Sequence, residues 1–500
     1  MEKNKSHKFY IDTLADTKSN LDRVSPSYCV AKWQQVTIHL ANGHTHSCHH
    51  PGTHLVPLDE LKSNPSALHN TNFKKQQRKM MLEGQRPTEC DYCWRVEDSP
   101  GDHYSDRVRK SSDWWARDLL QSSAELPWDA DVSPAYVEVN FSNVCNFSCG
   151  YCYPHISSSI MQDIKRHGPY ILTNHIWHDL NHYKSQGKIP IPVREHNPYV
   201  EAWWDWWPKL YPNLKVFRIT GGEPLLSKET WKTLDWILED KPNLNLELAF
   251  NTNLGVEQDL LEKFYYKCDE ILKKKLVKNI RIYTSCDTQG EHAEYIRNGL
   301  NYNRFYSNLW NLSLNFPRID TSIMCTFSLL SIPNFKNFLV DMLLLRKTPS
   351  ISKKLNGHRG VNLDFPYLRH PVQWSCLIAD QPELDTMITT LNYMKEKMPD
   401  FFAHEYENLN RIVNVMKYEQ SKDHETSRLD FYLFTKQYDS RYGKNLLKTF
   451  NGTSIIPFFE KCKSNFESKY GNQDIDKVVS DCKLENSFHT ISSLLKNKVL

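Results

Sequence analysis

Three cysteines, Cys145, Cys149 and Cys152, stand on one short segment, and their C-x3-C-x2-C spacing narrows both the chemistry and the fold of the chain. The segment directly follows an apolar run, 135–139, with the composition of a buried strand. Three thiolates on one loop can hold three irons of a [4Fe–4S] cluster and leave the fourth iron open for chemistry. A structural zinc site wants a fourth ligand close by, and an electron-transfer cluster a fourth cysteine, so the spacing favours a catalytic cluster. Half of a zinc site, or a chance trio of buried thiols, is the alternative.

A second motif, Thr220-Gly-Gly-Glu-Pro224, ends another strand-like run, 214–219. Its paired glycines, Gly221 and Gly222, let the backbone approach a ligand closely. Its carboxylate, Glu223, can bind an ammonium group. A lone motif of this kind would indicate only a turn, but it follows the cysteine loop in order, and each of the two motifs lies at a strand end.

Together the two motifs resemble the radical S-adenosylmethionine (SAM) superfamily, whose cysteine loop carries an aromatic residue before its last cysteine, as Tyr151 is here. The resemblance implies that the open iron binds SAM, that Tyr151 contacts this cofactor, and that Glu223 holds the amino group of its methionine part. It also implies reductive cleavage of SAM to a 5′-deoxyadenosyl radical that abstracts hydrogen from a substrate. The electron would come from a donor such as flavodoxin or ferredoxin.

Strand-like and helix-like runs alternate after the cysteine loop, which indicates an α/β fold with a parallel sheet. Further strands are expected at 245–251, 279–285, 319–326 and 361–365, and helices near 228–238, 256–272, 292–310 and 334–345. With the first two strands this makes six β/α units, and the resemblance implies the partial (β/α)6 barrel of the superfamily. At the strand ends, Asn253, Ser285 and Arg297 resemble the residues with which the superfamily contacts the ribose and carboxylate of SAM. Ordinary strand-end caps or turns are the alternative for these three.

Four further cysteines precede the barrel, and they are Cys29, Cys48, Cys90 and Cys93. A β-hairpin over 36–47 is expected to present the first two, and a helix near 73–83 leads to the C-x2-C pair. The set resembles the SPASM and twitch modules that bind an auxiliary [4Fe–4S] cluster, although those modules usually follow the barrel. A similar order occurs in radical SAM proteins of tailed phages and some bacteria. Four thiolates suit zinc equally well by number, so a structural zinc site is the alternative.

The sequence thus predicts an auxiliary-cluster module at 1–125, a partial barrel at 130–370 and a mostly helical extension at 371–500, with a turn at 439–445. The net charge of +3, from 62 basic and 59 acidic residues, gives no indication of a nucleic-acid surface. No apolar stretch has the length of a membrane span, and no signal-like segment opens the chain, so we expect a cytoplasmic protein, in the host cytoplasm if it is phage-encoded. In that compartment the 13 cysteines are expected to be metal ligands and core residues rather than disulfides.

Neither the fold nor the motifs name a substrate. Superfamily members with auxiliary clusters often modify peptides, so the resemblance makes a peptide the first candidate substrate and a nucleotide or sugar metabolite the second. Two other interpretations stay open: an enzyme that uses SAM differently, for instance for methyl transfer, and a non-catalytic iron–sulfur or zinc scaffold. The Gly-Gly-Glu-Pro motif argues against the scaffold, which has no use for it.

Overall fold

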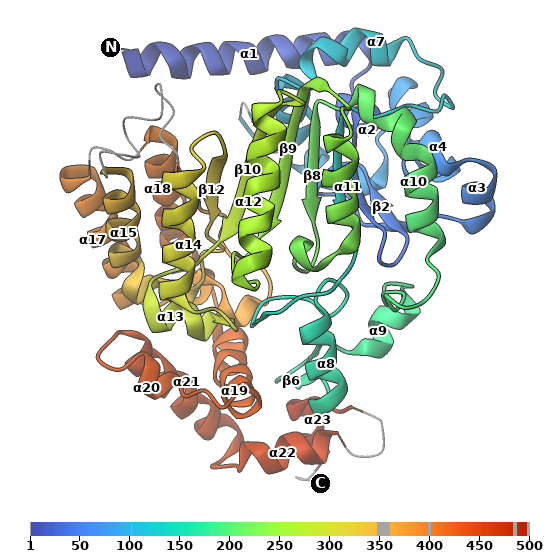
Figure 1. Ribbon diagram of the computed structural model, residues 1–500. Coiled ribbons are helices and arrows are strands. Elements are labelled where there is room, and N and C mark those ends of the chain that lie inside the picture. The colour runs from blue at the N-terminus through green and yellow to red at the C-terminus, as the bar shows by residue number, and fades with distance from the viewer. Residues whose placement is uncertain (1, 102, 348–360, 399–401, 484–487, 498–500) are drawn as a thin grey trace. The chain divides into compact units, whose positions relative to one another are not determined.

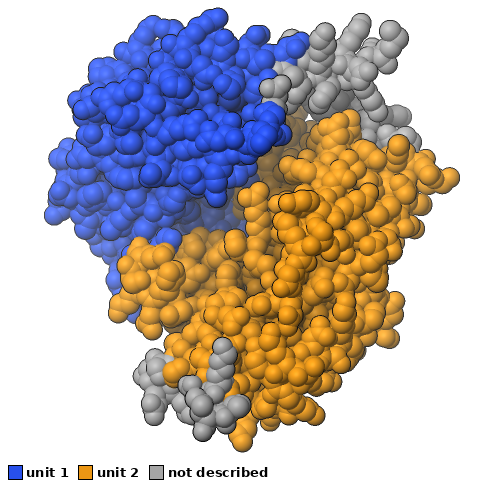
Figure 2. All heavy atoms as spheres, turned by 180° about the vertical axis from the view of Figure 1, so that it is seen from behind, with its two compact units in different colours: residues 1–143, 187–250, 270–280 blue, residues 144–186, 251–269, 281–500 orange. Residues whose placement is uncertain are grey.

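Strands and helices alternate along much of the chain (Figure 1), which divides into two compact units (Figure 2). The computed structural model describes residues 2–101, 103–347, 361–398, 402–483 and 488–497. Unit 1 comprises residues 1–143, 187–250 and 270–280, and unit 2 comprises residues 144–186, 251–269 and 281–500. Each unit is therefore assembled from segments that lie far apart in the sequence.

Unit 1 is built on a mixed sheet in the order β9-β8-β4-β1-β2-β3. These strands are β1 (Gln35–His39), β2 (His44–His46), β3 (His54–Leu55), β4 (Tyr136–Asn140), β8 (Val216–Thr220) and β9 (Asn243–Thr252), the last of which lies mostly in this unit. Strands β1, β4, β8 and β9 run parallel, whereas β2 and β3 are antiparallel to their neighbours. The expected hairpin is confirmed as β1 and β2. In addition β1 pairs with β4 in parallel, a pairing that the sequence pattern did not predict.

Aromatic packing covers one face of this sheet. Helices α10 (Pro198–Leu210) and α11 (Lys228–Leu238) lie along it (Figure 1). Trp203 and Trp207 of α10 are fully buried, with ring centroids 5.7 and 4.9 Å from that of Phe217 in β8. Because side chains alternate along a strand, the polar Glu138 of β4 and Arg218 of β8, which are register partners, project from the opposite face. One face of the sheet is therefore core and the other is polar.

Unit 2 contains the parallel strands β10 (Val277–Ser285, of which the second half lies in this unit), β12 (Asp320–Met324) and β13 (Val361–Asp364). Helices α12 (Gln258–Lys273, most of which lies in this unit), α14 (Tyr302–Asn315) and α15 (Phe335–Lys347) alternate with strands along the chain. The predicted alternation of strand and helix is confirmed by these elements.

The single helix expected at 292–310 is wrong. The chain forms α13 (Gly290–Ile296), then β11 (Arg297–Asn298), and only then α14. Strand β11 pairs antiparallel with β5 (Ser148–Cys149), with Arg297 opposite Cys149. A helix cannot continue through these two residues because their backbone groups bind the cysteine loop instead.

Beyond residue 371 the described chain is mostly helical, as predicted. The helices are α17 (Gln381–Lys397), α18 (Ala403–Glu419), α19 (Glu425–Tyr442), α20 (Leu446–Thr449), α21 (Ile455–Tyr470), α22 (Ile475–Cys482) and α23 (Ile491–Asn497). The turn expected at 439–445 is wrong in its first half, because α19 continues to Tyr442 and ends at Gly443, whose φ of +60° suits glycine. Within α19, Arg441 is buried and pairs with Asp163, Nη1 to Oδ2 at 2.9 Å. No helix in the described ranges is both long and apolar enough to cross a membrane.

Candidate metal and cofactor site

Hydrogen bonds hold the first cysteine of the loop against α8 (Ser158–His167). The Cys145 N–H donates to Ser158 Oγ at 3.1 Å, and Ser159 Oγ donates to the Cys145 carbonyl oxygen at 2.6 Å. Both hydroxyls lie in the first turn of α8, where polar side chains find unpaired backbone partners. This end of the loop is thereby fixed to a regular element of unit 2.

The other two cysteines are held by backbone contacts. Cys149 lies in β5, and the adjacent Gly150 N–H donates to the Ile296 carbonyl oxygen at 2.9 Å. The Cys152 N–H then closes a turn onto the Cys149 carbonyl oxygen, also at 2.9 Å. The thiol of Cys149 is buried, whereas those of Cys145 and Cys152 belong to partly exposed residues. Burial raises the pKa of the Cys152 thiol, and the Cys149 and Cys145 thiols add to this rise, so the three sulfurs are neighbours.

Large aromatic side chains of the C-terminal region pack beneath this loop. A Cβ added at Gly150 would lie 2.2 Å from the ring of Trp374, so no larger residue fits there without a shift. The Trp374 ring is fully buried and lies 4.9 Å, centroid to centroid, from that of Tyr438 in α19. Tyr438 in turn donates its hydroxyl to the Tyr295 carbonyl oxygen at 2.8 Å. Residues from near the end of the chain thus form the floor of the cysteine loop.

A buried ion pair lies beside the middle cysteine. Arg297 contacts Asp287 in bidentate fashion, Nε to Oδ2 at 2.8 Å and Nη2 to Oδ1 at 3.0 Å. Asp287 also accepts from the Tyr151 hydroxyl at 2.8 Å and from the Thr326 N–H at 2.9 Å. The remaining guanidinium nitrogen, Nη1, lies 3.8 Å from the Cys149 sulfur as a donor. Burial raises the pKa of the Cys149 thiol, and the guanidinium opposes that rise and so favours the thiolate.

In the structure, the side chains of Tyr151 and Arg297 both hydrogen-bond to Asp287. Their predicted contacts with SAM stay predictions. Asp287 lies in the Ser285-Cys-Asp287 segment at the end of β10, but sequence reasoning did not single it out as a site residue. Its signal was present: a carboxylate directly after a buried strand, with an arginine downstream, is a natural ion pair. The cysteine loop, the end of β10 and strand β11 therefore meet at one carboxylate.

Asn253 ties the cysteine loop to the segment after β9. Its Nδ2 donates to Asn146 Oδ1 at 2.8 Å, and its Oδ1 accepts from the Gly255 N–H at 2.8 Å. Asn146 Nδ2 donates to the Gly255 carbonyl oxygen at 2.9 Å, which completes the link. Ser285 is half-buried at the end of β10. Contacts of Asn253 and Ser285 with a cofactor stay predictions.

The predicted SAM-binding segment, Thr220–Pro224, lies in unit 1, and the backbone of its Gly221 packs closely against the side chain of Asn140. Gly221 has a φ of +125°, and a Cβ there would lie 2.7 Å from Asn140 Oδ1. The Gly222 N–H donates to the Ser142 carbonyl oxygen at 3.3 Å. The local geometry therefore requires glycine at position 221, as the motif indicated.

Asn140 is a candidate binding residue that sequence reasoning missed. It is 2% exposed at the end of β4, and its Oδ1 has no hydrogen-bond partner among the residues that the structure describes. An unsatisfied buried oxygen costs free energy unless a ligand or water donates to it. The signal in the sequence was its place, since a polar residue ends the strand just before the cysteine loop.

Glu223 is buried beside the same segment, with 1% of its surface exposed. Its Oε1 accepts from the Leu225 N–H at 3.0 Å and so caps the short 3-10 turn Pro224–Leu226. A carboxylate has room for several donors, so this cap leaves acceptor capacity for an ammonium group. The structure therefore gives Glu223 a local structural contact besides its predicted role in binding SAM.

The four N-terminal cysteines line a single pocket of unit 1. Cys29 precedes α2 (Val30–Gln34), Cys48 follows β2, and Cys90 and Cys93 flank the start of α5 (Asp91–Glu97). Burial raises the pKa of all four thiols, that of Cys93 to about 12. For Cys29 and Cys93 the neighbouring sulfurs add to this rise. The lining also holds charged side chains that were not anticipated from the sequence, and Lys32 is one of them.

Both thiol sets offer sulfur donors alone, which suit iron–sulfur clusters and zinc rather than hard cations. Among the residues that the structure describes, no group of three or more His, Cys, Asp or Glu side chains is arranged so that it could hold a metal ion. Because burial holds most of these thiols neutral, loading of either set would release protons. By donor chemistry, the residues therefore fit the clusters that the motifs predict.

At the level of class, the fold and these sites define an α/β protein with two thiol-rich candidate metal sites. No family model matches the chain, and no curated protein matches it. Among solved structures, the crystal structure of Streptococcus suis SuiB bound to precursor peptide SuiA is similar at 11% sequence identity and a TM-score of 0.32. That similarity covers 74% of this chain and 70% of the other. A TM-score this low supports no argument, so function must be inferred from the residues of this chain.

Proposed function

We propose that this protein is a radical SAM enzyme in which Cys145, Cys149 and Cys152 ligate a [4Fe–4S] cluster and the remaining iron binds SAM. When bound, this group supplies reductive cleavage of SAM to methionine and a 5′-deoxyadenosyl radical that abstracts hydrogen from a substrate. The observation that carries the proposal is the C-x3-C-x2-C loop, fixed at both ends and with a guanidinium beside its buried sulfur. The partial (β/α)6 barrel belongs to the same proposal, supported by the parallel strands of each unit.

The residues of the chain would hold, orient and shield the reacting groups. Arg297 donates to the Cys149 sulfur and so favours a thiolate ligand at this position. Glu223 binds the ammonium group of SAM, and the glycines before it let the backbone approach the cofactor. Contacts of Tyr151, Asn253 and Ser285 with SAM complete the proposed cofactor site.

The four-cysteine pocket is proposed to hold a second, auxiliary [4Fe–4S] cluster in an N-terminal module of the twitch or SPASM kind. A saturated four-thiolate cluster has no open iron, so its use would be electron relay or shaping of the substrate site. The proposed substrate is a peptide, with a nucleotide or sugar metabolite as the second candidate, and the electron donor is a flavodoxin or ferredoxin. A reducing cytoplasm suits this assignment of the cysteines.

Substitution of Glu223 separates its two roles. Glu223→Gln keeps an oxygen that can accept from the Leu225 N–H but loses the negative charge, so we expect SAM affinity to fall roughly 10- to 100-fold. Iron content should stay unchanged, because the carboxylate is not a metal ligand. The measurement is a titration of the cluster's visible spectrum with SAM, with the exposed Glu239→Gln as the control. Unchanged affinity in Glu223→Gln would show that the carboxylate serves only the turn.

Removing the C-x2-C pair tests the auxiliary site. In Cys90→Ala/Cys93→Ala we expect iron to fall from about eight to about four per chain, while SAM is still cleaved to 5′-deoxyadenosine. Cys462→Ala, at a buried cysteine outside both sets, should keep all of the iron. Iron, sulfide and zinc are measured on the anaerobically reconstituted proteins. A parent protein with about four irons and one zinc, which the double substitution loses, would assign the pocket to zinc instead.

A further inference from the structure

A buried lysine stands in the four-cysteine pocket. Lys32 of α2 has a side chain only 2% exposed, and it lines the pocket together with all four thiols. It forms an ion pair with Glu89, the residue directly before Cys90. Lysine is almost never buried this fully without a partner that favours its charge.

The helix that carries Lys32 is held in place from α4 (Asn72–Leu82) and the segment before it. Arg78 Nε donates to the Lys32 carbonyl oxygen at 3.3 Å, and His69 Nε2 contacts the Trp33 carbonyl oxygen at 2.7 Å. Both partner side chains are fully buried. Helix α2 has only five residues, so these contacts, rather than the helix itself, fix where the ammonium group lies.

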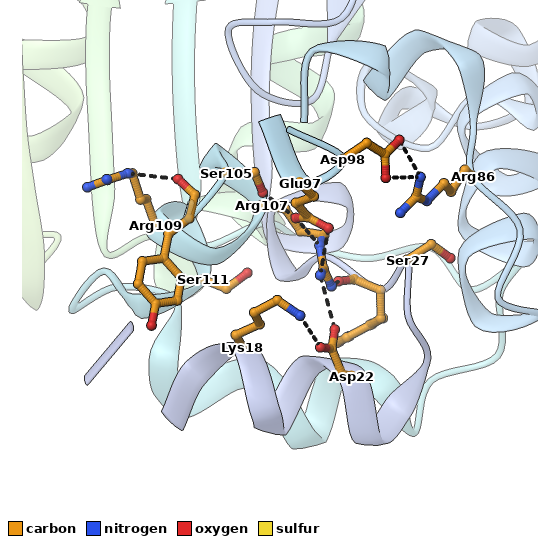
Figure 3. A network of polar contacts seen from close by, with 12 residues as sticks. Lys18, Asp22, Ser27, Arg86, Glu97, Asp98, Ser105, Arg107, Arg109 and Ser111 are labelled. Carbon is orange, nitrogen blue, oxygen red and sulfur yellow. Dashed lines mark hydrogen bonds and ion pairs between the residues drawn. The ribbon is translucent and has the colours of Figure 1, made fainter. Parts of the chain in front are cut away.

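Two other cations line the pocket, but each is less able to act on the sulfurs. Figure 3 shows Arg107 enclosed by carboxylates: its Nε donates to Glu97 Oε1 at 2.9 Å and its Nη2 to Asp22 Oδ1 at 3.0 Å. Its Nη1 donates to the Tyr28 carbonyl oxygen at 3.0 Å. Lys110 is half-buried, and solvent screens its charge more strongly. Lys32 is the buried cation that faces the thiols with a single carboxylate beside it.

The charges around Lys32 have a definite balance. Burial alone would lower the pKa of Lys32, but Cys90 and Glu89 beside it raise that pKa above its ordinary value. Glu89 does not line the pocket, whereas Lys32 does. The ammonium group therefore faces the thiols more directly than its carboxylate partner does.

We propose that Lys32 tunes the auxiliary cluster: its buried ammonium group, which lines the pocket with the four sulfurs, stabilises the reduced state. This inference rests on the proposed cluster in the four-cysteine pocket. One-electron reduction, by the proposed donor or by dithionite, adds one negative charge to the cluster and neither forms nor breaks a covalent bond. A fixed positive charge in a pocket of low dielectric constant lowers the free energy of the more negative state. Lys32 is thus a positioning residue rather than a catalytic one.

The test uses the 500-residue chain with Cys145, Cys149 and Cys152 replaced by alanine, so that only the auxiliary site can hold iron. In this background, Lys32→Met removes the charge but keeps an unbranched side chain, Lys32→Arg keeps the charge, and Glu89→Gln removes the opposing carboxylate. The exposed Lys62→Met is the matched control. Each protein is reconstituted anaerobically and titrated with dithionite against redox dyes, and the reduced fraction is followed by visible absorbance and electron paramagnetic resonance.

At a fixed potential, we expect the ratio of reduced to oxidised cluster to fall about tenfold or more in Lys32→Met. The ratio should rise in Glu89→Gln and stay near the parent value in Lys32→Arg and Lys62→Met. Lys32→Met could fail to retain its cluster because it leaves Glu89 unpaired. In that case the direction of the shift in reduction potential is measured in two other proteins, Glu89→Gln and the double substitution Lys32→Met/Glu89→Gln, which leaves no unpaired carboxylate.

Two results overturn the inference in distinguishable ways. A cluster that is present but keeps its potential in both Lys32→Met and Glu89→Gln removes the role of Lys32 and leaves the auxiliary cluster standing. Zinc in place of iron in the background protein removes the proposed auxiliary cluster itself, and the tuning role with it. Intact iron and unfolding midpoints in Lys32→Arg confirm that the readout reports charge rather than loss of fold.

Discussion

Replacing Cys145, Cys149 and Cys152 together by alanine should abolish SAM cleavage and lower the iron content from about eight to about four per chain. The loss of activity is expected to be complete, because no other group in the proposal can bind SAM through iron. The four irons that stay belong to the auxiliary site, so the protein should still be brown and show a reducible iron–sulfur signal. Iron and sulfide analysis, together with chromatography of 5′-deoxyadenosine after anaerobic reduction, measures both effects.

The matched control for this experiment is a triple substitution of buried cysteines outside the two sets, Cys268, Cys376 and Cys462. It removes the same number of thiols, so general loss of iron through damage to the fold would affect both proteins alike. Cleavage of SAM that survives in the loop variant would refute the assignment of these three cysteines. Complete loss of iron in the loop variant would instead leave no support for a second cluster.

A second large effect is expected at Asp287, which is fully buried and accepts four hydrogen bonds. Asp287→Asn leaves the Arg297 guanidinium buried without its counter-charge, which should lower the free energy of unfolding by about 3–5 kcal/mol. It should also weaken iron retention, since Arg297 and Tyr151 both lose their common partner next to Cys149. Urea unfolding gives the first quantity, and iron loss during anaerobic gel filtration gives the second.

The structure offers a matched control in the same unit. Arg346 and Glu405 form another buried bidentate pair, with Nη1 to Oε2 at 2.9 Å and Nη2 to Oε1 at 2.5 Å. Glu405→Gln should cost a similar amount of stability without changing iron retention, because the pair does not contact the cysteine loop. Asp98→Asn breaks an exposed pair with Arg86 and should change stability by about 0–1 kcal/mol. If Asp287→Asn and Glu405→Gln lose iron equally, the Asp287 network has no particular role at the cysteine loop.

Local patterns in the sequence predicted the elements whose signals are local. The hairpin around Asn42 and Gly43 and helix α11 were found where expected, because a turn signal and a 3.6-residue period lie within a few residues. The parallel pairing of β1 with β4 joins segments about a hundred residues apart, and no local pattern carries that information. Strands β5 and β11 have two residues each, which is too short to show any period.

The candidate site was predicted in the same uneven way. Cysteine spacing indicated the two thiol sets because the C-x3-C-x2-C loop and the C-x2-C pair each lie within a few residues, and the structure lines one pocket with the four N-terminal cysteines. The side chains that surround the sulfurs carry no such spacing. Lys32 looks like an ordinary polar position in a short helix, and Asp287 like a strand-end cap. Tertiary contacts place Lys32 in the four-cysteine pocket and pair Asp287 with Arg297 beside Cys149.

The aromatic floor under the cysteine loop bears on how this protein is made. During synthesis, Cys145 to Cys152 leave the ribosome long before Trp374 and Tyr438 have been added to the nascent chain. Until those rings arrive, Gly150 has nothing to pack on, and the loop must wait in an unfinished state with its thiols accessible. If the proposed cluster is present, insertion of iron and sulfide should therefore come late in synthesis, after α19 has been added. A chain that ends before α19 lacks this floor and should retain less iron at the cysteine loop.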